Sequence, residues 1–164
     1  MSVEFEPLVA GVGDRLWQRR EALVTAESCT GGWVAKVCTD RPGSSGWFER
    51  GFVTYSNEAK QELLGVSAAT LENRGAVSEA TVREMVAGAL RHSHAHWGLA
   101  ISGIAGPGGA TPDKPVGTVW FAWAGPHDWL STRRFRFDGD RDAVRRQAVE
   151  TALEVLLERL RVAP

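Results

Sequence analysis

The amino-acid sequence predicts a single layered α/β domain, and three observations lead to this prediction. The chain has 164 residues, a length that suits one domain and can bury a core without disulfides or metals. Hydrophobic residues make up 43% of the chain and charged residues 24%, which is typical of a globular protein. Short apolar runs alternate with segments of helical periodicity, and no internal repeat or linker-like tract interrupts them.

The first half of the chain predicts five elements that alternate between helix and strand. In order, we expect a helix over Ala10–Arg20, a short strand over Ala22–Ala26, a helix from Gly31 through Val37, a strand over Phe52–Tyr55 and a helix over Asn57–Leu64. The strands are assigned from their apolar, β-branched and aromatic residues. Asn57 is the expected N-cap of the last helix, and Gly65 is the residue expected to follow its end.

The second half of the chain predicts a helix, three strands and a final helix. We expect a helix from the N-cap Ser78 to about Arg91, central strands over Leu99–Ile104 and Val116–Ala124, a strand around Arg134–Phe137 and a helix that begins at Gly139 or Asp140. The first of these helices has an apolar stripe of Val82, Met85, Val86, Ala89 and Leu90. A hairpin from Val116 to Phe137 would add antiparallel strands to the sheet.

Charge and hydropathy argue against two broad classes of function, although a local basic patch stays open. Lys plus Arg is 19 and Asp plus Glu is 20, so the net charge of -1 gives no support for a general nucleic-acid or anionic-membrane binder. The longest uncharged stretch, Trp97–Pro112, is broken by glycines and Pro107, so it does not predict a spanning helix. Met1–Gly13 has no basic region followed by an apolar run, and we therefore expect a cytoplasmic protein.

The cysteines and histidines do not predict a metal site. Cys29 and Cys38 are the only cysteines, too few for a Cys-rich zinc site. His92, His94 and His96 lie at the end of a helical pattern, where helical spacing would splay them apart. We expect them to be solvated and to complement the dipole at the helix C-terminus.

The segment Thr25-Ala-Glu-Ser-Cys-Thr-Gly-Gly32 is the first candidate site. Ser28 lies between an expected strand and an expected helix, where free backbone N–H groups and the helix dipole would favour developing negative charge. Gly31 and Gly32 would let a ligand approach the backbone closely. The alternative is that Ser28 or Thr30 is merely the N-cap of the helix, and this segment alone favours that interpretation.

A second segment, Tyr55-Ser-Asn-Glu-Ala-Lys60, offers a base for a serine nucleophile. If Asn57 begins a helix, Lys60 lies in its first turn, where the helix dipole and partial burial would lower the pKa of the amine. Tyr55, at the end of a strand, would hold or relay a proton. The alternative is a solvated surface lysine beside a core tyrosine.

A third segment, Ser102-Gly-Ile-Ala-Gly-Pro-Gly-Gly109, follows an apolar strand and precedes Lys114-Pro-Val-Gly117. A glycine-rich loop in this position is where α/β proteins place ligands. The loop lacks the Gly-Lys-Ser/Thr of a P-loop and the following helix of a dinucleotide fingerprint, so it predicts a ligand loop without naming the ligand.

Six motifs in order resemble the CinA C-terminal domain family, and within it the stand-alone nicotinamide-nucleotide amidohydrolases of the PncC type. They are the three segments above together with Gly75-Ala-Val-Ser78, Lys114-Pro-Val-Gly-Thr118 and Gly139-Asp-Arg141, and the resemblance extends from about Leu8 to Leu160. It implies a three-layer α/β/α sandwich with a mixed sheet. It also implies that the amino-terminal domain of longer CinA proteins, and its pyrophosphatase activity, are missing.

The resemblance implies the deamidation of nicotinamide mononucleotide to nicotinate mononucleotide and ammonia, in pyridine-nucleotide recycling, without cofactor or metal. It makes Ser28 the nucleophile, Lys60 the general base and Tyr55 an assisting hydroxyl. The oxyanion would be held by backbone N–H groups near Thr30 and Gly31, with Ser102 or Gly103 opposite. For the phosphate, the candidates are the loop Gly106–Gly109, Lys114, and Arg141 or Arg145, although both arginines would equally suit a solvated helix surface.

Two other functions stay open at this point. One is a non-catalytic nucleotide-binding or competence- and damage-associated interaction module, which would have no reason to retain Ser28, Tyr55 and Lys60 together. The other is an amidase with a different substrate. The seven tryptophans are scattered rather than interleaved with a basic run, so we expect core or subunit-interface residues and a homo-oligomer, with no nucleic-acid or membrane partner.

Overall fold

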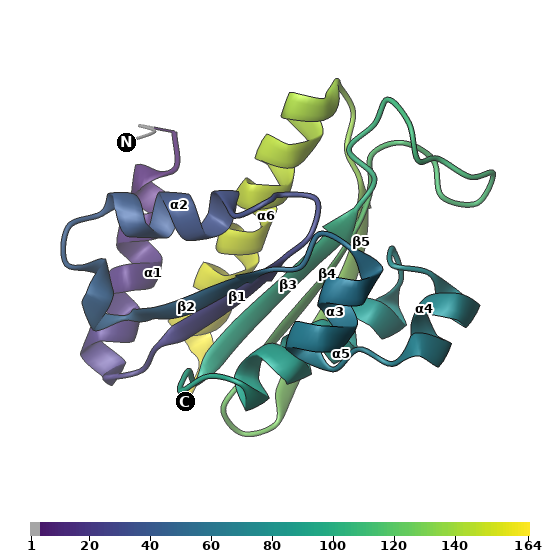
Figure 1. The fold of residues 1–164 in the computed structure, drawn as a ribbon. Helices are drawn as coiled ribbons and strands as arrows, with labels where there is room; N and C mark the ends of the chain where they lie inside the picture. Colours follow the sequence, from purple (N-terminus) through teal and green to yellow (C-terminus); the bar gives the residue numbers. More distant parts are fainter. Residues whose placement is uncertain (1–3) are drawn as a thin grey trace.

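The computed structural model describes residues 4–164 and contains a five-stranded mixed sheet between two layers of helices (Figure 1). The sheet has the order β2-β1-β3-β4-β5, with strands β1 (Leu23–Glu27), β2 (Phe48–Val53), β3 (Trp97–Gly103), β4 (Thr118–Gly125) and β5 (Trp129–Arg136). Strand β1 is parallel to β2 and β3, whereas β4 is antiparallel to β3 and β5. Residues 1–3, part of the segment used to predict localisation, lie outside the described residues.

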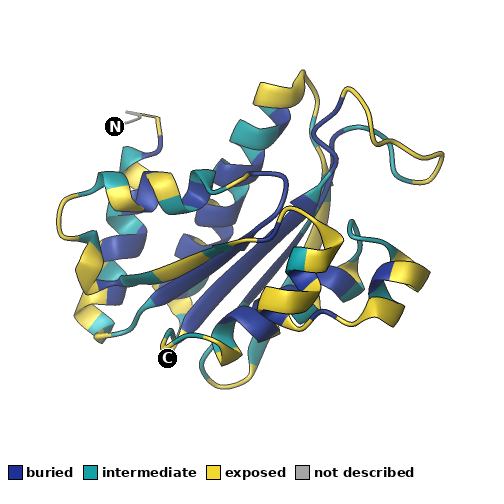
Figure 2. Ribbon diagram, viewed as in Figure 1, coloured by how far each residue is buried: buried dark blue, intermediate teal, exposed yellow. Residues whose placement is uncertain are grey.

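Each face of the sheet is covered by three α-helices. One layer contains α1 (Glu6–Arg19), α2 (Trp33–Asp40) and α6 (Arg141–Val162), and the other contains α3 (Asn57–Leu64), α4 (Ala68–Arg74) and α5 (Glu79–Arg91). A short 3-10 helix, η1 (Ser44–Gly46), precedes β2. Figure 2 shows the central strands buried between helices whose outer surfaces are exposed. The expected three-layer α/β/α sandwich is therefore confirmed.

Side-chain caps determine where four of the helices begin. Ser56, Ser67, Ser78 and Asp140 each accept a hydrogen bond from the backbone N–H three residues further on. The predicted cap Ser78 is confirmed, whereas the last helix, expected to begin at Gly139 or Asp140, begins at Arg141 with Asp140 as its cap. The prediction for α3 was wrong by one residue, because Ser56 is extended and accepts from the N–H of Ala59, which makes Asn57 the first helical residue.

Several element boundaries differ from the sequence prediction, and strand β5 begins at Trp129, five residues before the expected Arg134. The first helix begins at Glu6, four residues before Ala10. Strand β2 begins at Phe48 and ends at Val53, earlier than the expected strand over Phe52–Tyr55; it is an edge strand, and its exposed residues conceal the alternation. Helix α4 was not predicted, because only one of its seven residues is buried. The predicted β4–β5 hairpin is confirmed.

The topology places the chemistry at one end of the sheet. From β1 the chain crosses through α2 to β2 on one side, and then returns through α3, α4 and α5 to β3 on the other. Strand β1 thus lies at a topological switch point, where the carboxyl ends of parallel strands leave a crevice in α/β sheets. The first turn of α6 and the loop after β3 lie at the same end (Figure 1).

Within residues 4–164, no helix is both long and apolar enough to cross a membrane.

Candidate active site

Residues from three neighbouring strand ends line one cavity of about 260 Å³. Ser28 directly follows β1, Tyr55 and Lys60 follow β2, and Ser102 is the penultimate residue of β3. Gly103, Gly106 and Arg141 also form part of the wall. The three segments that the sequence singled out therefore meet in space, although Ser28 and Ser102 are 74 positions apart in the sequence.

Ser28 and Lys60 form the central pair of the cavity. The Nζ atom of Lys60 lies 2.8 Å from Oγ of Ser28 and 2.8 Å from the carbonyl oxygen of Thr54. The Lys60 residue is 1% exposed, and within the described part of the chain it forms no ion pair with a carboxylate. Burial lowers the pKa of Lys60 to about 8. The alternative of a solvated surface lysine is therefore wrong, and near neutral pH more of the Lys60 amine is neutral than in a solvated lysine.

The cap of α3 is what positions the lysine. Ser56 caps the helix through the N–H of Ala59, and the N–H of Lys60 donates to the carbonyl of Ser56. The preceding residue Thr54 still donates its N–H to Glu27 at the end of β1. The first turn of α3 is thus fixed to the neighbouring strand, and the long side chain of Lys60 extends from it to Ser28.

Ser28 is held by a tight turn rather than by the helix that follows. Its N–H donates to the carbonyl of Ile101 on β3, and its own carbonyl accepts from the N–H of Gly31. The turn ends at Gly31 and Gly32, which have φ values of 61° and 102°, a region that favours glycine. Gly32 is the N-cap of α2 and makes no side-chain cap, so the interpretation of Ser28 or Thr30 as N-cap is wrong.

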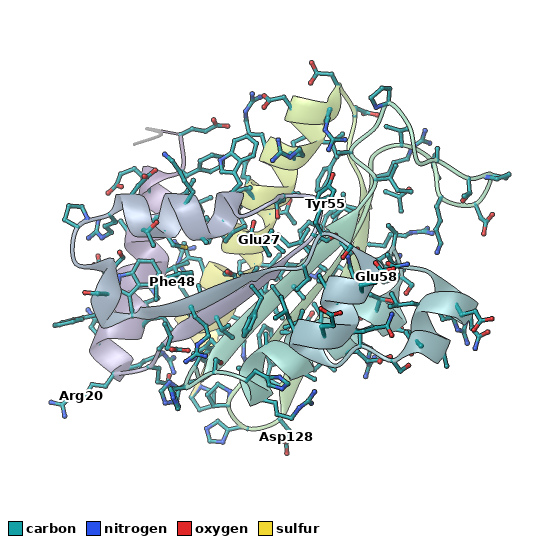
Figure 3. All side chains as sticks on the ribbon, viewed as in Figure 1. Arg20, Glu27, Phe48, Tyr55, Glu58 and Asp128 are labelled. Atoms are coloured by element: carbon teal, nitrogen blue, oxygen red, sulfur yellow. The ribbon has the colours of Figure 1, made fainter. Side chains whose placement is uncertain are left out.

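Glu27 supplies the missing cap of α2 from inside the protein (Figure 3). This carboxylate is 0% exposed; its Oε1 accepts from the Thr30 hydroxyl at 2.6 Å and from the Val34 N–H at 2.9 Å, and its Oε2 accepts from the Ala35 N–H at 3.1 Å. The expectation that this helix N-terminus is free for a ligand's negative charge is therefore wrong, because Glu27 already occupies it. Its position before Thr-Gly-Gly was the only sequence signal for this role.

Arg145 binds the same turn from α6. Its Nε donates to the Cys29 carbonyl at 3.0 Å, its Nη2 donates to the Thr30 carbonyl at 3.3 Å, and its guanidinium carbon lies 5.4 Å from the centroid of the Trp33 ring. In a trans peptide the N–H points opposite to the C=O. The contact with the Cys29 carbonyl therefore directs the N–H of Thr30 away from Arg145, and that N–H makes no hydrogen bond among the described residues.

Arg141 connects three parts of the cavity rim. Its Nη2 donates to the Tyr55 hydroxyl at 3.0 Å, and its Nη1 donates to the carbonyl of Gly106 at 2.8 Å. Tyr55 is 61% exposed, so the expected core tyrosine is in fact a rim residue (Figure 3). Other expected site residues contribute nothing to this cavity wall: Thr30, Gly31, Gly32, Lys114 and Arg145.

The thiols and histidines near the site do not form a reactive or metal-binding centre. Burial raises the pKa of the Cys29 thiol to about 12 and also raises the pKa of Cys38, with the charge of Glu27 acting in the same direction. Both thiols are therefore protonated at neutral pH. In the described part of the chain, no three His, Cys, Asp or Glu residues are grouped as a metal ion would require, and His92, His94 and His96 are exposed.

Comparisons with known proteins show the family of the chain. Residues 5–160 match the family model of the CinA C-terminal domain. The chain is 58% identical over 153 residues to the nicotinamide-nucleotide amidohydrolase PncC of Escherichia coli (strain K12), covering 93% of each chain, and 50% identical to the protein of that name from Pseudomonas putida, covering 92% of this chain and 94% of the relative. The crystal structure of a competence/damage inducible protein from Agrobacterium tumefaciens superposes with a TM-score of 0.94 at 41% identity, covering 98% of this chain and 99% of that one.

Proposed function

The chain belongs to the CinA C-terminal domain family, and we propose that it hydrolyses nicotinamide mononucleotide to nicotinate mononucleotide and ammonia through a covalent serine–lysine mechanism. The observation that carries the proposal is the 2.8 Å contact between Ser28 Oγ and Lys60 Nζ on the wall of a cavity. A serine needs an adjacent base to act as a nucleophile, and a lysine with a lowered pKa can be that base.

The reaction begins with attack of Ser28 on the carboxamide carbon, which the pyridinium ring makes electrophilic. Neutral Lys60 takes the Ser28 proton as the C–O bond forms, and it returns that proton to the amide nitrogen as the C–N bond breaks. Ammonia leaves and an ester links Ser28 to the nicotinoyl group. Lys60 then removes a proton from water, which attacks the ester, and the proton returns to Ser28 Oγ.

The turn after Ser28 supplies hydrogen-bond donors for the oxyanion. We assign this role to the N–H of Cys29, which lines the cavity, because Thr30 and Gly31 lie outside the cavity wall and the N–H of Gly31 already binds the Ser28 carbonyl. Ser102, which is buried and lines the cavity, is the donor assigned to the opposite side. A donor of this kind lowers the barrier by about 3 kcal/mol, provided its position is fixed before the reaction. Glu27 and Arg145 fix the turn from two sides.

Tyr55 acts in this proposal as the assisting hydroxyl. Arg141 donates to its oxygen, so the phenolic proton stays free to point toward the cavity and to interact with the leaving nitrogen. The same arginine holds the Gly106 carbonyl, which keeps the glycine-rich loop at the cavity rim.

Assembly and location form a further part of the proposal. Trp17 is 63% exposed, in keeping with the expectation that some tryptophans serve a subunit interface, and we propose a homo-oligomer in the cytoplasm. The chain is proposed to act without metal and without nucleic-acid or membrane partners.

The deciding experiment is an ammonia-release assay on the purified protein with nicotinamide mononucleotide, nicotinamide and NAD. Release from nicotinamide mononucleotide alone would support the proposal. Release from nicotinamide or NAD in preference would indicate a different amidase, and no release from any of the three would favour a non-catalytic binding module.

A further inference from the structure

Two of the six sequence motifs have no part in the mechanism above, and the fold brings them into contact. Nζ of Lys114, the first residue of Lys114-Pro-Val-Gly-Thr118, donates to the carbonyl of Arg74 at 2.7 Å, across 40 positions of sequence. Arg74 directly precedes Gly75-Ala-Val-Ser78, and a Cβ atom on Gly75 would lie 3.2 Å from the same Nζ. The two motifs are therefore joined through one lysine side chain.

The motif that begins at Gly75 forms one wall of the catalytic cavity, because Ala76 and Val77 line it. The turn is anchored to α5: the Gly75 carbonyl accepts from the Ser78 hydroxyl at 2.9 Å and from the buried Thr81 hydroxyl at 2.7 Å. Gly75 has a φ value of 79°, a region that favours glycine. This wall of the cavity is thus fixed to the helix layer.

The glycine-rich loop between β3 and β4 forms another wall of the same cavity. Gly106, Gly108 and Gly109 line the cavity, and the loop projects outward from the sheet (Figure 1). The N–H groups of Thr111 and Lys114 each donate to the other residue's carbonyl, at 3.0 and 3.1 Å. Residues 107–113 are all exposed, so little packing holds this part of the loop.

Lys114 connects these two walls. Within residues 4–164, its bond to Arg74 is the one hydrogen bond that links residues 104–117 to the layer of α3, α4 and α5. The Arg74 carbonyl belongs to the last turn of α4, where carbonyls lack partners inside the helix and a cation is favourable. The position of the loop relative to the opposite wall therefore depends on this ammonium group.

We propose that Lys114 is a positioning residue for the reaction at Ser28. Its hydrogen bond to Arg74 keeps the glycine-rich loop and the turn at Ala76–Val77 at one separation, so that a bound carboxamide stays within attacking distance. The inference rests on the proposed function. Attack requires the reacting atoms to be about 3–3.5 Å apart, and a displacement of about 1 Å can lower the rate strongly. Lys114, expected from the sequence at the phosphate, lies outside the cavity wall and acts through the loop.

The test removes the Lys114 donor and then restores one. Lys114→Met keeps an unbranched side chain without a hydrogen-bond donor, and Lys114→Arg keeps a cationic donor. Arg83→Met is the matched control, because Arg83 is an exposed cation on the same surface groove as Lys114 and belongs to neither motif. All three positions lie at the surface, where substitution has little effect on folding.

Two kinds of measurement are made on each variant. Steady-state ammonia release gives kcat and KM for nicotinamide mononucleotide. Amide hydrogen exchange is followed at Gly75 and Thr111, whose N–H groups donate to Leu71 and Lys114 on the two sides of the connection.

We expect Lys114→Met to lower kcat about tenfold with little change in KM, because the substrate still binds but is no longer held at attacking distance. Exchange at both amides should become faster in this variant. Lys114→Arg should restore most of the lost kcat, and Arg83→Met should leave kcat, KM and both exchange rates unchanged.

Three results would overturn the positioning role and leave the proposed function standing. A raised KM with unchanged kcat in Lys114→Met would make Lys114 a substrate ligand. A lower melting temperature with unchanged kinetics would make it a structural residue only. An equal loss of kcat in Arg83→Met would assign the effect to surface charge. If the unaltered protein released no ammonia from the mononucleotide, the proposed function would fail and this inference with it.

Discussion

Lys60 Nζ lies 2.8 Å from Ser28 Oγ, although 32 positions of sequence separate the two residues. Ser28 directly follows β1, whereas Lys60 belongs to α3, which follows β2. The contact depends on the parallel pairing of β1 and β2, which places residues 28 and 54 at the same edge of the sheet. The Lys60 amine is buried, and its hydrogen bond to the Thr54 carbonyl fixes its direction. The predictions below follow from this pair and from the groups that hold it.

Removal of the nucleophile should abolish turnover without unfolding the protein. We expect Ser28→Ala to lower kcat for nicotinamide mononucleotide by at least about 10³-fold, because among the described residues Ser28 carries the one hydroxyl that Lys60 contacts. Cys29→Ala is the matched control at the next position and should keep most of the activity, since the thiol is protonated. Ammonia-release assays measure the turnover of both variants, and circular dichroism checks that both are folded. A folded Ser28→Ala protein with near-normal turnover would exclude the covalent mechanism.

The buried carboxylate of Glu27 should act as a positioning residue. We expect Glu27→Gln to reduce kcat about tenfold with little change in KM. The NH₂ group of glutamine cannot accept the hydrogen bonds that a carboxylate oxygen accepts from Thr30, Val34 or Ala35, so the turn at Thr30 becomes less well fixed. The same change should lower the free energy of unfolding by about 2 kcal/mol. Steady-state kinetics and denaturant titration measure the two effects. Glu58→Gln, an exposed carboxylate in the first turn of α3, is the control and should alter neither quantity.

The sequence predicted the layers and the three site segments well, because each depends on local patterning. It could not predict which distant groups complete the site. In the sequence, Glu27 has no feature that distinguishes it from a surface carboxylate. The fold buries it between β1 and α2, where it accepts hydrogen bonds from the backbone N–H groups of α2. Arg145 was expected at the phosphate, but a single arginine in a helix carries no signal for the two carbonyls that it binds.

Errors at element boundaries have similar physical causes. Strand β2 lies at the edge of the sheet, so Glu49 and Arg50 interrupt the apolar pattern that marks a buried strand. The cap of α3 was placed at Asn57 instead of Ser56, because both residue types cap helices well and only the backbone angles distinguish them. The Ser28–Lys60 pair itself was identified through the family resemblance; composition and spacing alone did not separate Lys60 from a surface lysine.

Removal of divalent metals should leave the activity unchanged. The described residues contain no group of His, Cys, Asp or Glu arranged as a metal site, and the serine–lysine chemistry needs no Lewis acid. Ammonia release is measured after dialysis against a chelator, and again after zinc or magnesium is added back. A loss of activity that is restored by one metal would show that the account of the site is incomplete.

Substitution of the base should show that its proton acceptance matters, and not its charge. We expect Lys60→Arg to lose nearly as much activity as Lys60→Ala, about 10²-fold or more, because a guanidinium stays protonated and cannot accept the Ser28 proton. The two variants are compared by kcat on nicotinamide mononucleotide. Substantial turnover by Lys60→Arg would make Lys60 an electrostatic residue and would move the search for the base to Tyr55, which lines the same cavity.

The pH dependence of kcat/KM for the unaltered protein tests the central claim most directly. Burial lowers the pKa of Lys60 to about 8, below its ordinary value, so the neutral and active form gains population as the pH rises. The account predicts that kcat/KM rises about tenfold per pH unit well below this value and levels off above it. A profile that is flat between about pH 7 and 9, or that falls with rising pH over that range, would contradict a neutral Lys60 as the general base.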